Sequence, residues 1–129
     1  MTTLIICLLI ATLLPIIAKS PVAVAMNNAG GYDNNHPRAQ QGKLTGFGAR
    51  ALAAHQNAFE SLIFFAPAVL LAIATNNSSE LITQLAIAHV TARVLYNAMY
   101  LLDFGILRSL VWSVGFLTSI GIIYQCIPS

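Results

Sequence analysis

The sequence contains very little charge. Only 8% of its 129 residues are Asp, Glu, Lys or Arg, whereas 57% are apolar, and an ordinary soluble domain has about 25% charged residues. So few ionised side chains cannot cover the surface of a soluble fold of this length. The composition therefore excludes a soluble globular enzyme and a disordered chain, and it indicates a membrane protein.

Cysteine and net charge are also sparse. The two cysteines, Cys7 and Cys126, have neither the spacing of metal ligands nor the pattern of a disulfide framework. We therefore expect no metal site, and we interpret both cysteines as small apolar packing residues. The formal net charge of +2 is too small and too scattered to predict nucleic-acid binding.

The apolar segments are long enough to cross a bilayer several times. One crossing takes about 20 helical residues, so the chain has room for at most four or five spans and for no separate soluble domain. No Lys or Arg precedes the first apolar run, which favours a retained span over a signal peptide. The expected spans are residues 2–26, 44–75, 80–102 and 106–127, joined first by a polar loop at 27–43. The prediction is a single all-α domain over residues 1–129, an integral membrane bundle of four transmembrane helices.

Basic residues gather at one side of the expected bundle. Four lie in or beside the first connection and one beside the third, namely Lys19, Arg38, Lys43, Arg50 and Arg108. The second connection and both termini have none. Because Lys and Arg concentrate in cytoplasmic loops, we expect the first and third connections to face the cytoplasm and both termini to face away from it.

Polar and ionisable side chains interrupt the second and third expected spans, where each costs a few kcal/mol or more unless it has a partner or a purpose. At about 100° per residue, Arg50, Asn57 and Glu60 share one face of the second span, and His55 points away from them. The third span carries a stripe of its own, formed by His89, Arg93, Tyr96, Asn97 and Tyr100. Both stripes are expected in the cytoplasmic half of the bilayer.

These stripes have two interpretations. In the structural one, Glu60 and Arg93 form a buried ion pair between helices, and Asn57 and Asn97 link the same helices by hydrogen bonds. In the functional one, the stripes line a polar pocket that opens to the cytoplasm. Two arginines with one nearby carboxylate leave such a pocket positively charged, which favours an acidic ligand.

The segment RALAAHQNAFE, from Arg50 to Glu60, resembles the signature helix of the MAPEG family, the membrane-associated proteins of eicosanoid and glutathione metabolism. The family's His-x-Asn-x-x-Glu core is present as His55, Asn57 and Glu60. One departure is Ala53, which occupies a position where glutathione-binding members usually have an arginine.

A second segment strengthens the resemblance. The run ARVLYNAMY, which ends at Tyr100, together with the later Arg108, is similar to the family's Arg-x-x-Tyr-x-x-x-Tyr motif with a downstream arginine. Residues 31–38 and 107–112 look more like a bacterial branch of inner-membrane proteins. The resemblance covers essentially the whole chain, and it implies four-helix subunits that assemble as homotrimers.

The resemblance also implies a ligand and a set of site residues. Glutathione would bind as a co-substrate between subunits near the cytoplasmic face, with Arg108 beside its sulfur and Tyr100 as the second catalytic residue. The remaining residues that would bind glutathione are Arg50, Asn57, Glu60, Arg93 and Tyr96.

Two functions follow as alternatives from this resemblance. The first is a glutathione-dependent transferase or peroxidase that acts on hydrophobic electrophiles. The second, prompted by Ala53, is a non-catalytic membrane protein that binds a lipid or a small acidic ligand. A small proton-coupled exporter is a third class, but it needs a free carboxylate in the membrane, and Glu60 is expected to have arginine partners.

Overall fold

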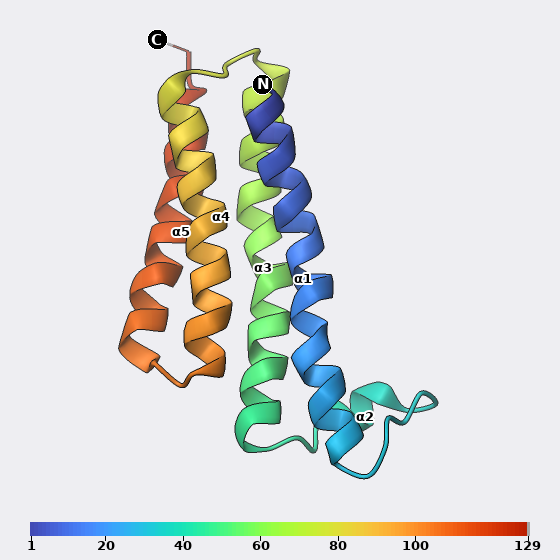
Figure 1. Cartoon of the computed structure of the whole chain (residues 1–129). Coiled ribbons are helices and arrows are strands. Elements are labelled where there is room, and N and C mark those ends of the chain that lie inside the picture. The colour runs from blue at the N-terminus through green and yellow to red at the C-terminus, as the bar shows by residue number, and fades with distance from the viewer. Residues whose placement is uncertain (129) are drawn as a thin grey trace.

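The fold of the protein was analysed in a computed structural model that describes residues 1–128. Over these residues the chain forms four long helices and one short one and contains no strand. The helices are α1 (Thr2–Asn28), α2 (Pro37–Gln41), α3 (Gly46–Ala74), α4 (Glu80–Leu101) and α5 (Gly105–Gln125). The bounds predicted for the long helices differ from these by two residues or fewer at each end. The four long helices run alongside one another, and the first turn of α1 lies at the same end of the bundle as the last turn of α5 (Figure 1).

The long helices form two neighbouring pairs. α1 packs on α3 and α4 packs on α5, while α4 also contacts α1 and α3 (Figure 1). Buried apolar residues from all four long helices, among them Leu4, Phe65, Ile82 and Ile122, form one core cluster. Cys7 is buried in this cluster and Cys126 packs against it, and both are free thiols.

Large apolar side chains also cover the outside of the bundle. Ile16 is 64% exposed, Ile63 69% and Ile106 82%, a distribution that suits hydrocarbon and not water. α1, α3 and α5 are each long and apolar enough to cross a membrane. The protein is therefore a multi-pass membrane protein with three candidate spans, and the crossing expected for α4 stays a prediction.

The two tight turns end their helices in the same way. Asn76 after α3 and Asp103 after α4 have φ of 52° and 66°, in the left-handed region where glycine is most common and Asn or Asp next. In each turn the next amide reaches back to the helix, from Asn77 to Ala72 O at 2.9 Å and from Phe104 to Met99 O at 2.9 Å. Ser79 then caps α4 as an acceptor from the Ile82 amide.

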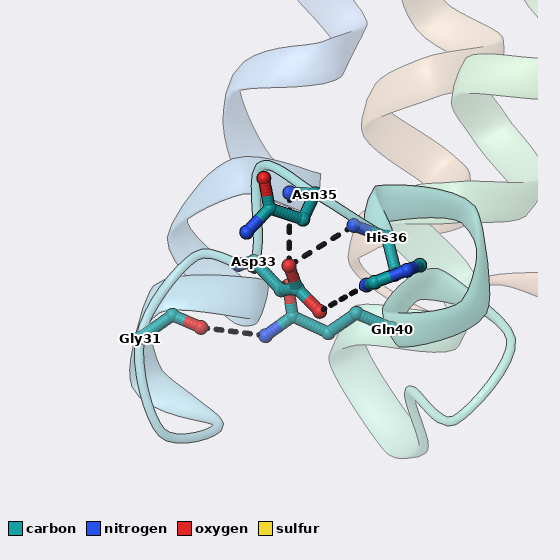
Figure 2. A network of polar contacts seen from close by, with 5 residues as sticks. All are labelled: Gly31, Asp33, Asn35, His36 and Gln40. Atoms are coloured by element: carbon teal, nitrogen blue, oxygen red, sulfur yellow. Dashed lines mark hydrogen bonds and ion pairs between the residues drawn. The ribbon is translucent and has the colours of Figure 1, made fainter.

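The polar connection after α1 is held together by one side chain. Gln40, on α2, donates from Nε2 to Gly31 O at 2.7 Å and to Met26 O at 3.1 Å, and its Oε1 accepts from the Asp33 amide at 2.9 Å. Asp33 in turn accepts from the backbone amides of Asn35 and His36 (Figure 2). The predicted loop thus contains a short helix, α2, whose glutamine ties the loop to the end of α1.

Candidate functional site

α3 and α4 face each other through three polar side chains near the middle of the bundle. The Arg93 guanidinium, in a residue only 2% exposed, donates from Nη2 to both the side-chain Oδ1 and the backbone oxygen of Asn57. Asn57 Nδ2 donates to Glu60 Oε2 at 2.8 Å. Asn57 is therefore the link between Arg93 on one helix and Glu60 on its own.

Aromatic contacts extend this set toward the α4–α5 turn. The Arg93 Cζ lies 4.3 Å from the ring centre of Tyr96, and the Arg108 Cζ lies 4.2 Å from that of Tyr100. The two tyrosine rings are 5.5 Å apart at an interplanar angle of 71°. We call the continuous series formed by Glu60, Asn57, Arg93, Tyr96, Tyr100 and Arg108 the polar chain.

The polar chain carries an excess of positive charge. Within residues 1–128, neither Arg93 nor Arg108 has a carboxylate within 4.0 Å, and Glu60 forms no ion pair. Glu60 is exposed, so its carboxylate is accessible from outside the bundle. Two arginines and one carboxylate give a site that can receive an anionic group at the arginines and an ammonium group at Glu60.

Arg50 is the one predicted site residue that lies outside the polar chain. Its Nη1 is 3.6 Å from Asp103 Oδ2, and Asp103 occupies the left-handed position of the α4–α5 turn. The carboxylate in this turn, which lies far from Arg50 in sequence, gives the arginine a partner. Helical periodicity places Arg50 on the face of Asn57 and Glu60, but tertiary packing directs its side chain to the turn.

The ion pair considered between Glu60 and Arg93 is absent at the 4.0 Å limit among the described residues. Asn57 does link the two helices, whereas Asn97 Nδ2 donates to Arg93 O, on its own helix, at 2.9 Å. His55 reaches the other neighbour of α3, with Nδ1 2.8 Å from Pro15 O on α1. At the polar chain, α3 and α4 are therefore joined by charge-assisted hydrogen bonds from Arg93 to Asn57 and not by an ion pair between Glu60 and Arg93.

A second polar group, centred on His89 of the predicted stripe, lies beside the polar chain. His89 Nδ1 lies 2.8 Å from Gly115 O on α5 and 3.0 Å from Ser119 Oγ. The available signals were the spacing of four residues between His89 and Arg93 and the small residues Gly115 and Ser119, also four apart on α5, a spacing typical of close helix contacts in membranes. No group of three or more His, Cys, Asp or Glu residues that could hold a metal ion occurs within residues 1–128.

Comparison with known proteins identifies the family. The model of the MAPEG family matches residues 3–128, nearly the whole chain. A search of curated proteins and a search of solved structures gave no match. Family membership suggests a membrane function related to glutathione or eicosanoid metabolism. Because the match extends over both polar helices and all the helices around them, the chain belongs to the MAPEG family.

Proposed function

We propose that the protein is a membrane-bound, glutathione-dependent transferase or peroxidase-like enzyme that acts on hydrophobic electrophiles. The observation that carries the proposal is the polar chain, in which two arginines without carboxylate partners and one exposed carboxylate lie along a continuous path from α3 to α5. Glutathione, a tripeptide thiol, offers groups that match these charges: a carboxylate for Arg93, an ammonium group for Glu60 and a thiolate for Arg108.

In this proposal the polar chain binds and orients glutathione. Arg93 receives a carboxylate, Glu60 receives the ammonium group, and Asn57 and Tyr96 hold these two side chains in place. The membrane of residence is the bacterial inner membrane, with the α4–α5 turn on the cytoplasmic side and both termini opposite. Assembly as a homotrimer would place glutathione between subunits, where the exposed Glu60 faces outward from its own bundle.

The proposed reaction takes place at the cytoplasmic end of the polar chain. Arg108, held over the Tyr100 ring, favours the thiolate form of the bound sulfur by its fixed charge, and the Tyr100 hydroxyl donates a hydrogen bond to it. The thiolate attacks an electrophilic carbon of a substrate that arrives through the bilayer. A carbon–sulfur bond forms, and the leaving group departs with its bonding electrons.

An aryl halide assay tests this proposal. The full-length protein in detergent is mixed with glutathione and 1-chloro-2,4-dinitrobenzene, and the thioether product is followed by absorbance. Loss of one charge-assisted interaction costs about 1.5–3 kcal/mol, so Arg108→Ala should lower kcat/KM by about 10- to 150-fold. Arg38→Ala, which removes an exposed loop arginine outside the polar chain, is the matched control. A wild-type rate equal to that of buffer, or equal rates for wild type and Arg108→Ala, would contradict the proposal.

A second candidate function is non-catalytic binding of a lipid or a small acidic ligand. The observation that favours it is the pairing of Arg50 with Asp103, which leaves the position of Ala53 without a substitute for the family's usual arginine. Thermal stability measured across thiols, lipids and organic anions separates the two functions, because a ligand at 100 times its Kd adds about 2.7 kcal/mol. Stabilisation by glutathione and by none of the other ligands would count against this candidate. Because Ala53→Arg restores the arginine that the family usually has at this position, it should tighten glutathione binding by about tenfold or more.

A further inference from the structure

A cleft of about 210 Å³ opens between α3, α4 and α5, beside the polar chain. It is lined by His89 and Arg93 from α4, by Phe64 and Glu60 from α3, and by Trp112 and Phe116 from α5. Gly115 also lines it, ten residues beyond the first residue of α5. At 1.5 Å per residue this is about 15 Å along the helix, half of a hydrocarbon core of about 30 Å. A ligand of this cleft would therefore come from the bilayer.

His89 gives the cleft a hydrogen-bond acceptor. The residue is 1% exposed, and its ring stacks on Phe65 with centroids 3.9 Å apart and an angle of 4°. Since a carbonyl oxygen only accepts, the contact of 2.8 Å between Nδ1 and Gly115 O places the proton of the neutral ring on Nδ1. The Ser119 hydroxyl donates to the same carbonyl. Nε2 is then an acceptor, and it has no hydrogen-bond partner among residues 1–128.

Arg93 adds an unpartnered donor one helical turn away. Its Nη2 is occupied by Asn57, but its Nε, also buried, makes no hydrogen bond. A buried polar group without a partner costs about 1–3 kcal/mol, and the two residues that carry this acceptor and this donor both line the cleft. A hydroxyl group can donate to one and accept from the other at the same time.

The apolar part of the cleft is aromatic. Phe64 and Phe116 meet edge to face at 5.3 Å, and Trp112 stacks on Phe116 at 5.6 Å and 5°. Aromatic walls favour a ligand ring through offset and edge contacts. An apolar cavity of about 150 Å³ is known to hold benzene, so a cleft of about 210 Å³ fits one substituted ring.

We propose that this cleft binds a small lipophilic phenol, whose ring lies among Phe64, Trp112 and Phe116 and whose hydroxyl donates to His89 Nε2 and accepts from Arg93 Nε. A phenol suits the pair better than an aliphatic alcohol, because its hydroxyl is the more acidic donor and its oxygen faces a guanidinium. This binding requires no thiol, so it stands or falls separately from the proposed transferase activity.

Trp112 makes the proposal directly measurable, because it is the only tryptophan of the chain and it lines the cleft. A bromine atom quenches indole fluorescence at contact. The full-length protein in lipid vesicles is titrated with 4-bromophenol and, in parallel, with 4-bromoanisole, which has the same ring but no hydroxyl proton. Excitation is above 295 nm, and concentrations are corrected for the measured partitioning of each compound into lipid. We expect saturable quenching with a Kd about tenfold lower for the phenol, as one hydrogen bond to a buried unpaired acceptor predicts.

Two histidine variants locate the hydroxyl. His89→Asn keeps a donor for Gly115 O but removes the Nε2 acceptor, and it should abolish the preference for the phenol. His55→Asn is the matched control, because His55 makes the same Nδ1 contact of 2.8 Å, to Pro15 O, outside the cleft. It should leave the preference unchanged.

A third variant keeps the test decisive if His89→Asn does not fold. Ser61 lines the cleft, and its hydroxyl bonds only to Ala58 O of its own helix. Ser61→Leu should therefore fill the cleft and remove the saturable quenching by both compounds. Two results in the wild type would overturn the proposal: equal Kd values for phenol and ether, or quenching that does not saturate. Two results in the variants would also overturn it: a preference for the phenol that survives in His89→Asn, or saturable quenching that survives in Ser61→Leu.

Discussion

Replacing Asn57 by alanine removes the side chain that joins α3 to α4 at the polar chain. The Arg93 guanidinium would lose its bond to Oδ1 and keep only the backbone oxygen of residue 57, at 3.3 Å, and the Tyr96 ring, at 4.3 Å. Because Arg93 is 2% exposed, solvent cannot replace the lost acceptor. We therefore expect Asn57→Ala to destabilise the fold as well as the site.

The magnitude lies between two reference values. A hydrogen bond to a charged group contributes about 1.5–3 kcal/mol in soluble proteins, whereas interhelical hydrogen bonds within a membrane average about 0.6 and reach about 1.7 kcal/mol. Arg93 is charged and buried, which favours the upper end of the membrane range. The expected loss in the free energy of unfolding is about 1.5 kcal/mol.

Reversible unfolding in mixed micelles of increasing dodecyl sulfate content, followed by the fluorescence of Trp112, measures this loss. Asn97→Ala is the matched control, because its amide bonds to Arg93 O on the same helix and its removal should cost less than about 0.5 kcal/mol. A double-mutant cycle of Asn57→Ala with Arg93→Met should give a coupling energy of about 1 kcal/mol. Equal losses for the two asparagine variants, or a coupling energy near zero, would refute the reasoning.

Three further outcomes are expected. Gly48→Ala places a Cβ 3.1 Å from that of Ala25 on α1, so α1 and α3 must move apart. The free energy of unfolding should fall by about 1–3 kcal/mol in the same assay, and an unchanged unfolding midpoint would contradict this prediction. Gln40→Ala removes three hydrogen bonds of the first connection, so limited proteolysis there should be faster than in wild type, and an unchanged cleavage rate would count against the role of this glutamine. A variant without the two native cysteines can carry one new cysteine at either end of α4, as Glu80→Cys or Leu102→Cys. The two cysteines should react with an impermeant maleimide from opposite sides of the membrane. Labelling of both from one side only would exclude a crossing by α4.

Helical periodicity accounts for the part of the site that the sequence predicts. Asn57 and Glu60 are three residues apart, and Arg93, Tyr96 and Tyr100 follow spacings of three and four, so each set falls on one face of a regular helix wherever that helix packs. The contacts along each set, such as Asn57 with Glu60 and Tyr96 with Tyr100, are local in sequence. They follow from the backbone alone, which is why they were predictable.

Contacts between helices follow different rules and were not predictable in the same way. The partner of Arg50 is Asp103, which reaches it only because the α4–α5 turn places that carboxylate beside α3. The shape of the cleft depends on how closely α5 approaches α4 at Gly115. The approach is close, because a Cβ at this position would lie 3.1 Å from Arg93 Cδ. Spacing within one helix carries no information on such distances between helices.

The same distinction explains why α4 is the one long helix whose composition does not identify it as a span. Two of its ionisable residues, His89 and Arg93, face inward and are 1% and 2% exposed, while Ile87 and Val94 on its outer face are 48% and 47% exposed. Mean hydropathy counts both faces, although lipid meets only the outer one. Moreover, α4 runs alongside the other three long helices (Figure 1). The crossing by α4 therefore stays a prediction that the labelling experiment tests, and the polar chain and the cleft that α4 carries inside the bundle account for part of its low hydropathy.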